Sequence, residues 1–368
     1  MSRSKHIPFR VALATSVIAA NLAVGQIAAA ADQTSDGQWF HGFLHTAQAQ
    51  KTSRGAGVVV AVIDTGVAHH GDLDAAVSDG LDLTGLGSDD GRTDLVGHGT
   101  AMAGLIAASG RVNGIAPAAK IISVRATGLG NGIGAGGRIE EGIRWAADHG
   151  ATVISISLAT VYTPEVDRAI QEAMAADIVV VAAIGNSPPD VAATYPAALP
   201  GVVAVGSVDR AGRHSPRSVV SPKVVVSAPG VDISSTYKDG RYSYGTGTSN
   251  ATAIVAGAVA LVRSKYPNMP ATEVIHRLTA TATDKGPKGR DDQYGYGVIN
   301  LVAALTADVP PLTPSAAPST APSTAPSKNA EAPADEPLNL GILLAGLAGL
   351  LILVALIAGA VILASRRR

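Results

Sequence analysis

Short, nearly continuous apolar runs alternate with stretches of helical periodicity through residues 52–305, and this alternation restricts the fold more than any other feature. The runs are rich in Val and Ile and do not alternate with polar residues. Strands of this kind are typical of a parallel sheet that is covered on both faces. The predicted strands are 58–63, 121–124, 153–158, 178–183, 202–205 and 224–227. The predicted helices are 100–108, 139–148, 164–176 and 249–266. The sequence therefore predicts an α/β fold with a doubly wound, mostly parallel sheet.

Three short segments of this region carry residues suited to nucleophilic catalysis. Asp64 follows the first predicted strand, His98 lies in a Gly-His-Gly-Thr segment, and Ser249 follows Gly247 and Thr248 at the start of a predicted helix. A serine hydroxyl becomes a good nucleophile when an imidazole takes its proton and a carboxylate orients that imidazole. The chain order of Asp, His and Ser is that of subtilisin and of neither other common triad fold. The three residues predict a serine peptidase.

Asn186 is a fourth candidate, because it closely follows the predicted strand 178–183. Its side-chain amide can donate to an oxyanion together with the backbone N–H of Ser249. Each candidate has a structural interpretation when it is taken alone, since serine commonly caps helices and asparagine commonly forms turns. Their occurrence together and in order favours the catalytic interpretation.

These segments closely resemble the subtilisin-like serine proteases over residues 55–305. The resemblance implies that Ser157, Leu158 and Ala159 form an edge strand that pairs with an extended polypeptide substrate. It also implies that Ala183 and Gly185 form the opposite wall of the primary specificity pocket.

Two positions depart from the family pattern. Ala159 stands where these proteases usually have glycine, so we predict a narrow pocket that prefers small side chains. After Ser249 the sequence Asn250-Ala251-Thr252-Ala253 lacks the proline that is typical of the family, which could shift the helix start and weaken catalysis.

The two ends of the chain carry apolar segments. Residues 1–31 have basic residues, an apolar stretch and a run of alanines, which is typical of a secretory signal peptide; an uncleaved membrane anchor is the alternative. Residues 338–365 include about 25 consecutive residues without a polar side chain, enough to span a bilayer. The basic tail 366–368 is then expected on the cytoplasmic side, with the catalytic domain extracytoplasmic. A proline-, alanine-, serine- and threonine-rich linker, 308–337, precedes the span.

This organisation leaves a short N-terminal extension, 32–51, and a peptidase domain, 52–307. It resembles the mycosins, membrane-anchored proteases associated with type VII secretion. The resemblance implies that the extension, with Trp39, Phe40 and Leu44, packs on the domain without silencing it. It also implies secretion-system membrane components as partners. A largely structural subunit of a secretion complex, with little or no proteolysis, is the alternative function.

Several other classes of site are not expected. The chain has no cysteine, and 28 Lys and Arg nearly balance 29 Asp and Glu, so neither a disulfide framework nor a nucleic-acid partner is predicted. Residues 132–137 match a dinucleotide fingerprint, but no acidic residue ends the following strand. We interpret His69, His70, Asp72 and Asp74 as a solvated turn. The loop 109–113 is shorter than the ligand loop of the calcium-binding subtilisins that the chain resembles, so no calcium is predicted there. No other metal and no cofactor are predicted.

Overall fold

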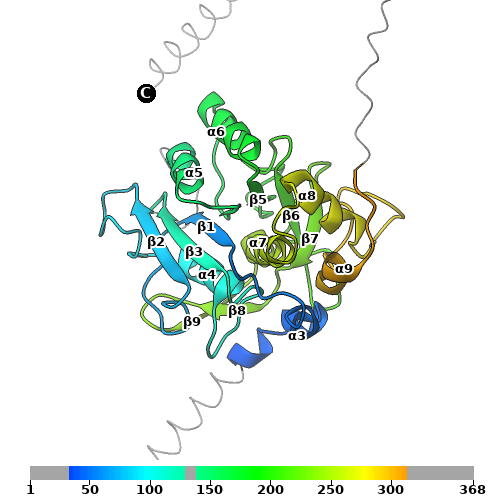
Figure 1. Ribbon diagram of the computed structural model, residues 1–368, viewed down its shortest axis with the longest axis horizontal. Coiled ribbons are helices and arrows are strands. Elements are labelled where there is room, and N and C mark those ends of the chain that lie inside the picture. Colours follow the sequence, from blue (N-terminus) through cyan, green and yellow to red (C-terminus); the bar gives the residue numbers. More distant parts are fainter. Residues whose placement is uncertain (1–32, 129–137, 313–368) are drawn as a thin grey trace, which may run out of the picture. The chain divides into compact units, whose positions relative to one another are not determined.

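Seven parallel strands form the central sheet, in the order β2-β3-β1-β4-β5-β6-β7 (Figure 1). The structure is a computed structural model that describes residues 33–128 and 138–312. The prediction of a mostly parallel sheet is confirmed. The sheet strands are β1 (Val59–Asp64), β2 (Val77–Asp82), β3 (Lys120–Arg125), β4 (Val153–Ile156), β5 (Val179–Ala183), β6 (Val203–Val208) and β7 (Val226–Pro229).

The direction of winding reverses at β1, which lies between β3 and β4. Strands β2 and β3 extend the sheet on one side of β1, and β4 to β7 extend it on the other. In doubly wound sheets, the crevice beyond the carboxyl ends of the strands at such a reversal is the usual place for a ligand. The topology therefore directs attention to the ends of β1 and β4.

Helices cover both faces of the sheet. The described helices are α2 (Phe40–Phe43), α3 (Thr46–Ala49), α4 (His98–Ala107), α5 (Ile139–Asp148), α6 (Pro164–Ala175), α7 (Thr248–Lys265), α8 (Ala271–Ala280) and α9 (Leu301–Thr306). Helices α5 and α6 contribute to one apolar core, and α4 and α7 contribute to the other. In β1, Val60 and Val62 enter the α4–α7 core while Ala61 and Ile63 enter the α5–α6 core. Because successive side chains of a strand point to opposite faces, both sets must be apolar.

A two-stranded antiparallel hairpin, β8 (Ile233–Thr236) and β9 (Tyr242–Gly245), packs against α4 outside the main sheet. Ser235 Oγ donates to Ala101 O at 2.6 Å, and Thr236 Oγ1 donates to Thr100 O at 2.7 Å. Gly104 permits this approach, since a Cβ there would lie 2.2 Å from Thr236 Oγ1. The hairpin is thereby held beside the first turns of the helix that begins with His98.

The N-terminal extension packs on the domain along the same hairpin. Phe40 is fully buried and Leu44 nearly so, and both belong to the core that contains α4 and α7. Trp39 Nε1 donates to Val231 O at 3.1 Å, and Asp36 forms an ion pair with Arg210 at 2.8 Å. The extension is therefore an integrated part of the folded domain.

Some elements differ from the sequence predictions. Strand β2 was not predicted, because its residues Val-Ser-Asp-Gly-Leu-Asp lie at the sheet edge and are partly exposed. Helix α7 begins at Thr248, one residue before the predicted start. Residues 250–253, which differ from the family pattern, are helical.

Most of the predicted terminal segments and one internal segment lie outside the described residues. The terminal segments are the signal peptide 1–31, the membrane span 338–365, the basic tail 366–368 and nearly all of the linker 308–337. The internal one is the glycine-rich segment 132–137. Within the two described ranges, no helix combines the length and apolarity needed to cross a membrane.

Candidate active site

Asp64 and His98 meet where the end of β1 faces the start of α4. Asp64 Oδ1 accepts hydrogen bonds from His98 Nδ1 at 2.7 Å and from Thr65 N at 2.8 Å. The carboxylate is fully buried, while the His98 side chain is 28% exposed. Asp64 Oδ2 is buried and has no hydrogen-bond partner among the described residues. His98 and Thr65 therefore supply the hydrogen bonds that compensate for burial of this charge.

The pKa of His98 is raised above its usual 6.5. Burial alone lowers the pKa of the imidazole, but the charge of Asp64, the hydrogen bond to Asp64 and the charge of Asp94 together outweigh burial. An imidazolium is thus stabilised at this position, as a general base requires once it has taken a proton.

Ser249 lies in the first turn of α7, where backbone N–H groups have no acceptor within the helix. Its hydroxyl donates to Ser157 O at 3.3 Å, and Ser157 Oγ donates to Ser249 O at 3.3 Å. In the described part of the chain, the partner of this hydroxyl is thus Ser157, in the segment that follows β4, rather than His98. Hydrogen bonds of catalytic groups are often long or poorly aligned before a substrate binds.

Asn186 lies beside Thr248, which begins α7. Its Oδ1 accepts hydrogen bonds from Thr248 N at 2.9 Å and from Thr248 Oγ1 at 3.2 Å. Because the amide oxygen is engaged, the Nδ2 group remains as the donor for a ligand. The backbone of Asn186 is fixed by Asp190, whose Oδ2 accepts from Asn186 N at 2.7 Å.

A cleft of about 530 Å³ brings these residues together. His98, Ser249 and Asn186 line it, and Asp64 lies behind His98, outside the lining. The cleft is also lined by all five residues predicted for substrate binding, which are Ser157, Leu158, Ala159, Ala183 and Gly185. No described residue of the N-terminal extension lines it.

Several cleft or supporting residues were missed by the sequence analysis. Asp190 and Arg217 are the carboxylate and the guanidinium that line the cleft, and Thr194 and Tyr237 line it as well. Their positions depend on loop packing, so no local motif indicates them. Asp94 could have been found, because it precedes His98 by only four residues and lies just before the start of α4.

The residues considered for metal binding make other contacts. Asp72 Oδ2 accepts from Val112 N at 3.1 Å and from Tyr242 Oη at 3.1 Å, which closes the short loop 109–113. His70 Nε2 lies 3.1 Å from Arg241 O, and Asp74 pairs with Arg92. Across 33–128 and 138–312, no cluster of three or more His, Asp or Glu side chains could hold an ion.

The chain is similar in sequence to a known family of proteins. The model of the subtilase family matches residues 55–297. This chain belongs to the subtilase family. Subtilisin DY of Bacillus licheniformis is 40% identical over 258 residues, covering 68% of this subtilase and 92% of the relative. The thermostable alkaline protease of Halalkalibacterium halodurans is 37% identical over 267 residues, covering 71% and 72%. The chain is accordingly a serine endopeptidase.

Solved structures extend the similarity to the mycosins. The subtilase matches MycP1 with its N-terminal propeptide removed at a TM-score of 0.67 and 32% identity, over 74% of this chain and 98% of that one. It matches the MycP3 protease from the type VII (ESX-3) secretion system at a TM-score of 0.62 and 34% identity, over 73% and 88%. MycP1 from Mycobacterium smegmatis matches at 0.65 and 29%, over 80% and 89%.

Proposed function

We propose that this subtilase is a membrane-anchored, extracytoplasmic endopeptidase whose triad is Asp64, His98 and Ser249. The 2.7 Å contact between Asp64 Oδ1 and His98 Nδ1 carries the proposal. This contact assigns the proton to Nδ1 and leaves Nε2 as the base that faces the cleft. The placement of Ser249 in the same cleft supports its assignment as the nucleophile.

The reaction follows from these positions. His98 Nε2 takes the proton of Ser249 Oγ as that oxygen attacks the carbonyl carbon of the scissile peptide. Asn186 Nδ2 and the Ser249 N–H donate to the oxyanion that forms. His98 then protonates the leaving amine. In the second half of the reaction, His98 takes a proton from the water that attacks the acyl carbonyl carbon, and it returns a proton to Ser249 Oγ as the acyl group leaves. Asp64 orients the imidazole and stabilises its cationic form throughout.

The substrate is proposed to bind as an extended polypeptide against Ser157, Leu158 and Ala159. The segment continues β4 at the cleft, and main-chain pairing there would place the scissile bond at Ser249. Ala183 and Gly185 lie across the primary pocket. No metal or cofactor takes part in the proposed reaction.

The cellular setting is proposed from the chain ends and from the similar structures. A signal peptide in 1–31, a span in 338–365 and the three arginines after it would hold the peptidase on the outer side of the membrane. MycP1 and MycP3 are proteases from type VII secretion systems. We infer that this chain acts beside a system of that kind. The orientation is tested by adding a protease to intact cells. The basic tail should be protected from digestion while residues 52–307 are accessible, and an accessible tail would contradict the proposed orientation.

A largely structural role in a secretion complex is the second candidate. The observation that favours it is the hydrogen bond of Ser249 Oγ to Ser157 O in place of His98. Labelling of the full chain with an active-site fluorophosphonate distinguishes the two functions. The enzyme proposal expects a label on Ser249 that is lost in Ser249→Ala and slowed in His98→Ala. Absence of label on folded wild-type protein, with secretion supported equally by wild type and Ser249→Ala, would favour the structural role.

A further inference from the structure

Asp94 is a buried carboxylate that the proposed reaction does not use. The residue is only 5% exposed, and in the described part of the chain no Lys, Arg or His forms an ion pair with it. Its two oxygens accept five hydrogen bonds. An ionised carboxylate offers acceptors only, so five donors and no acceptor fit the charged form. A charge without an opposite charge is kept in a protein interior when such bonds compensate for its burial.

Four of the five hydrogen bonds come from the backbone and side chains immediately around His98. Oδ1 accepts from Val96 N at 3.0 Å and from Gly97 N at 2.7 Å. Oδ2 accepts from Thr100 N at 3.0 Å and from Thr100 Oγ1 at 2.6 Å. Asp94 therefore holds the chain on both sides of His98.

This arrangement replaces an ordinary helix cap. The residue before α4 is Gly97, which has a φ of 91° and no side chain to bind the free N–H groups of the first turn. Asp94 binds one of these groups, Thr100 N, from four residues before His98. A negative charge at the amino end of a helix is also stabilised by the helix dipole. The position and angle of the first turn, and hence of His98, depend on this carboxylate.

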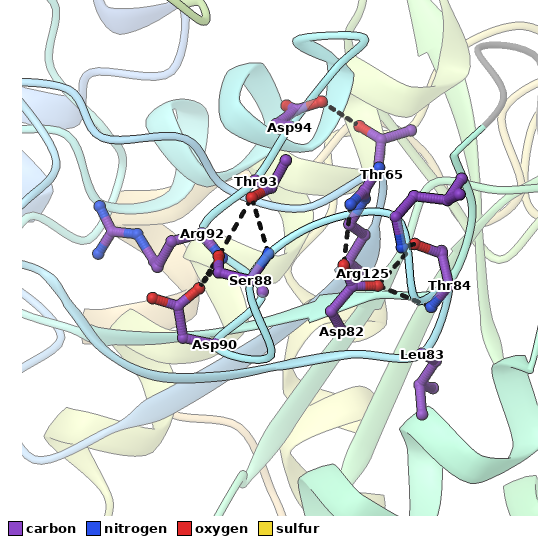
Figure 2. A network of polar contacts seen from close by, with 12 residues as sticks. Thr65, Asp82, Leu83, Thr84, Ser88, Asp90, Arg92, Thr93, Asp94 and Arg125 are labelled. Carbon is purple, nitrogen blue, oxygen red and sulfur yellow. Dashed lines mark hydrogen bonds and ion pairs between the residues drawn. The ribbon is translucent and has the colours of Figure 1, made fainter.

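The fifth hydrogen bond connects Asp94 to Thr65, the residue that follows Asp64 at the end of β1. Thr65 Oγ1 donates to Asp94 Oδ1 at 2.9 Å (Figure 2) and accepts from Gly99 N at 2.9 Å. Thr65 N donates in turn to Asp64 Oδ1 at 2.8 Å. The end of β1 and the start of α4 are thus joined by the Asp64–His98 contact, by the hydrogen bond from Gly99 N to Thr65 Oγ1, and through Thr65 and Asp94.

We propose that Asp94 is a positioning residue for His98. From the loop before α4, Asp94 holds the imidazole in place against Asp64 and stabilises its cationic form. This inference rests on the proposed role of His98 as the general base. Asp94 acts through the backbone of α4 and through its charge, and it does not touch the substrate. Its function differs from that of Asp64, which contacts the imidazole directly.

The charged groups around His98 make this role measurable. Asp64 from β1 and Asp94 from the loop before α4 are the charges that raise the pKa of His98. Asp190 and Arg217 line the same cleft, Tyr237 Oη donates to Val96 O, and Lys238 Nζ donates to Leu95 O. Removing the charge of Asp94 should therefore lower the pKa of His98.

The first test compares Asp94→Asn with Asp90→Asn. Asp90 is an exposed aspartate of the same loop that binds Ser88 and Arg92, so the matched substitution changes charge without touching the start of α4. In Asp94→Asn we expect kcat on a peptide substrate to fall about tenfold or more with KM nearly unchanged. We also expect the acidic limb of kcat/KM to move to lower pH, because a nearby negative charge that raises the pKa of His98 is lost. Asp90→Asn should keep the wild-type profile. An unchanged profile and kcat in folded Asp94→Asn would overturn the proposal.

A second measurement does not depend on activity. The ring resonances of His98 can be titrated by NMR in Ser249→Ala and in Ser249→Ala with Asp94→Asn. The proposal expects the lower pKa of His98 in the double variant, and equal values would reject it. If wild-type protein hydrolyses nothing while this shift is present, the proposed function fails and the role of Asp94 stands. If Asp94→Asn does not fold, Thr65→Val should lower the pKa of His98 in the same direction. Thr65→Ser keeps the hydroxyl and should restore most of the wild-type pKa. Equal pH profiles for the two Thr65 variants would again reject the proposal.

Discussion

His98 Nδ1 lies 2.7 Å from Asp64 Oδ1, and the carboxylate behind the imidazole is completely buried. A buried charge beside an imidazole favours the protonated ring, and the pKa of His98 is raised above 6.5 accordingly. In the proposed mechanism, the geometry that prepares His98 to hold a proton in the transition state also keeps it protonated to a higher pH in the free enzyme.

The pH dependence of hydrolysis follows from this shift. Only neutral His98 can accept the proton of Ser249, so activity should rise with pH as His98 loses its proton. Because the pKa of His98 is raised, the midpoint of this acidic limb in kcat/KM should lie above 6.5. The measurement is a profile of kcat/KM from pH 5 to 9 on a fluorogenic peptide. A midpoint below 6.5 would show that burial, and not Asp64, dominates the titration.

Asn186 accepts hydrogen bonds from Thr248, and we propose that it also donates to the oxyanion; two variants distinguish these roles. In Asn186→Leu, the oxyanion loses a donor and Thr248 N loses the acceptor Oδ1. Removal of one such donor from subtilisin costs about 10²–10³ in kcat, and we expect a loss of that order here. Asn186→Asp keeps the acceptor for Thr248 N but has no amide donor. We expect kcat to fall in both variants and the melting temperature to fall chiefly in Asn186→Leu; unchanged kcat in either would refute the oxyanion assignment.

The primary pocket should select small side chains. Ala159 lines the cleft together with Ala183 and Gly185, and it carries a methyl group where these proteases usually have glycine. A peptide library should show cleavage after Ala or Ser in preference to Phe. Ala159→Gly should raise kcat/KM for Phe relative to Ala by about tenfold, the usual effect of one methyl group in a pocket. The exposed Ala211→Gly serves as control, and equal wild-type rates after Phe and Ala would contradict the prediction.

Arg125 and Asp82 form a buried ion pair on which stability should depend. Arg125 Nη1 donates to Asp82 Oδ2 at 2.8 Å, both side chains are almost completely buried, and Thr84 also donates to Asp82 (Figure 2). Arg125 Nε and Nη2 have no partner among the described residues. Asp82→Ala would leave the guanidinium uncompensated and should lower the free energy of unfolding by about 3–5 kcal/mol. Arg125→Met combined with Asp82→Leu should cost much less; equal losses in urea unfolding would show that packing and not charge explains the effect.

The buried core could be predicted from the sequence for a physical reason, and the segments that we propose to be catalytic could be recognised in it. Strands such as β1 and β5 are buried on both faces, so nearly every residue in them must have an apolar side chain. Asp64, His98 and Ser249 are each surrounded by residues needed for a local turn or helix start, which makes a short segment recognisable.

Other features could not be predicted because they depend on distant contacts. The hairpin β8–β9 has mixed burial and no clear period, and its place is set by packing on α4. Ser249 Oγ bonds to Ser157 O across 92 residues, and no local pattern determines which way that hydroxyl points. The hydrogen bond from Thr65 Oγ1 to Asp94 likewise arises only after the end of β1 and the start of α4 have come together.

The N-terminal extension should contribute to stability without restraining catalysis. Phe40 is fully buried in the core shared by α4 and α7, so Phe40→Ala should lower the free energy of unfolding by about 3–5 kcal/mol. No described residue of the extension lines the cleft, so kcat and KM below the melting temperature should stay within about twofold of wild type. Gln48→Ala, at an exposed position of α3, is the matched control and should change neither quantity. A several-fold rise in kcat/KM of Phe40→Ala would contradict this prediction, because it would mean that the extension restrains the active site and that its removal activates the enzyme.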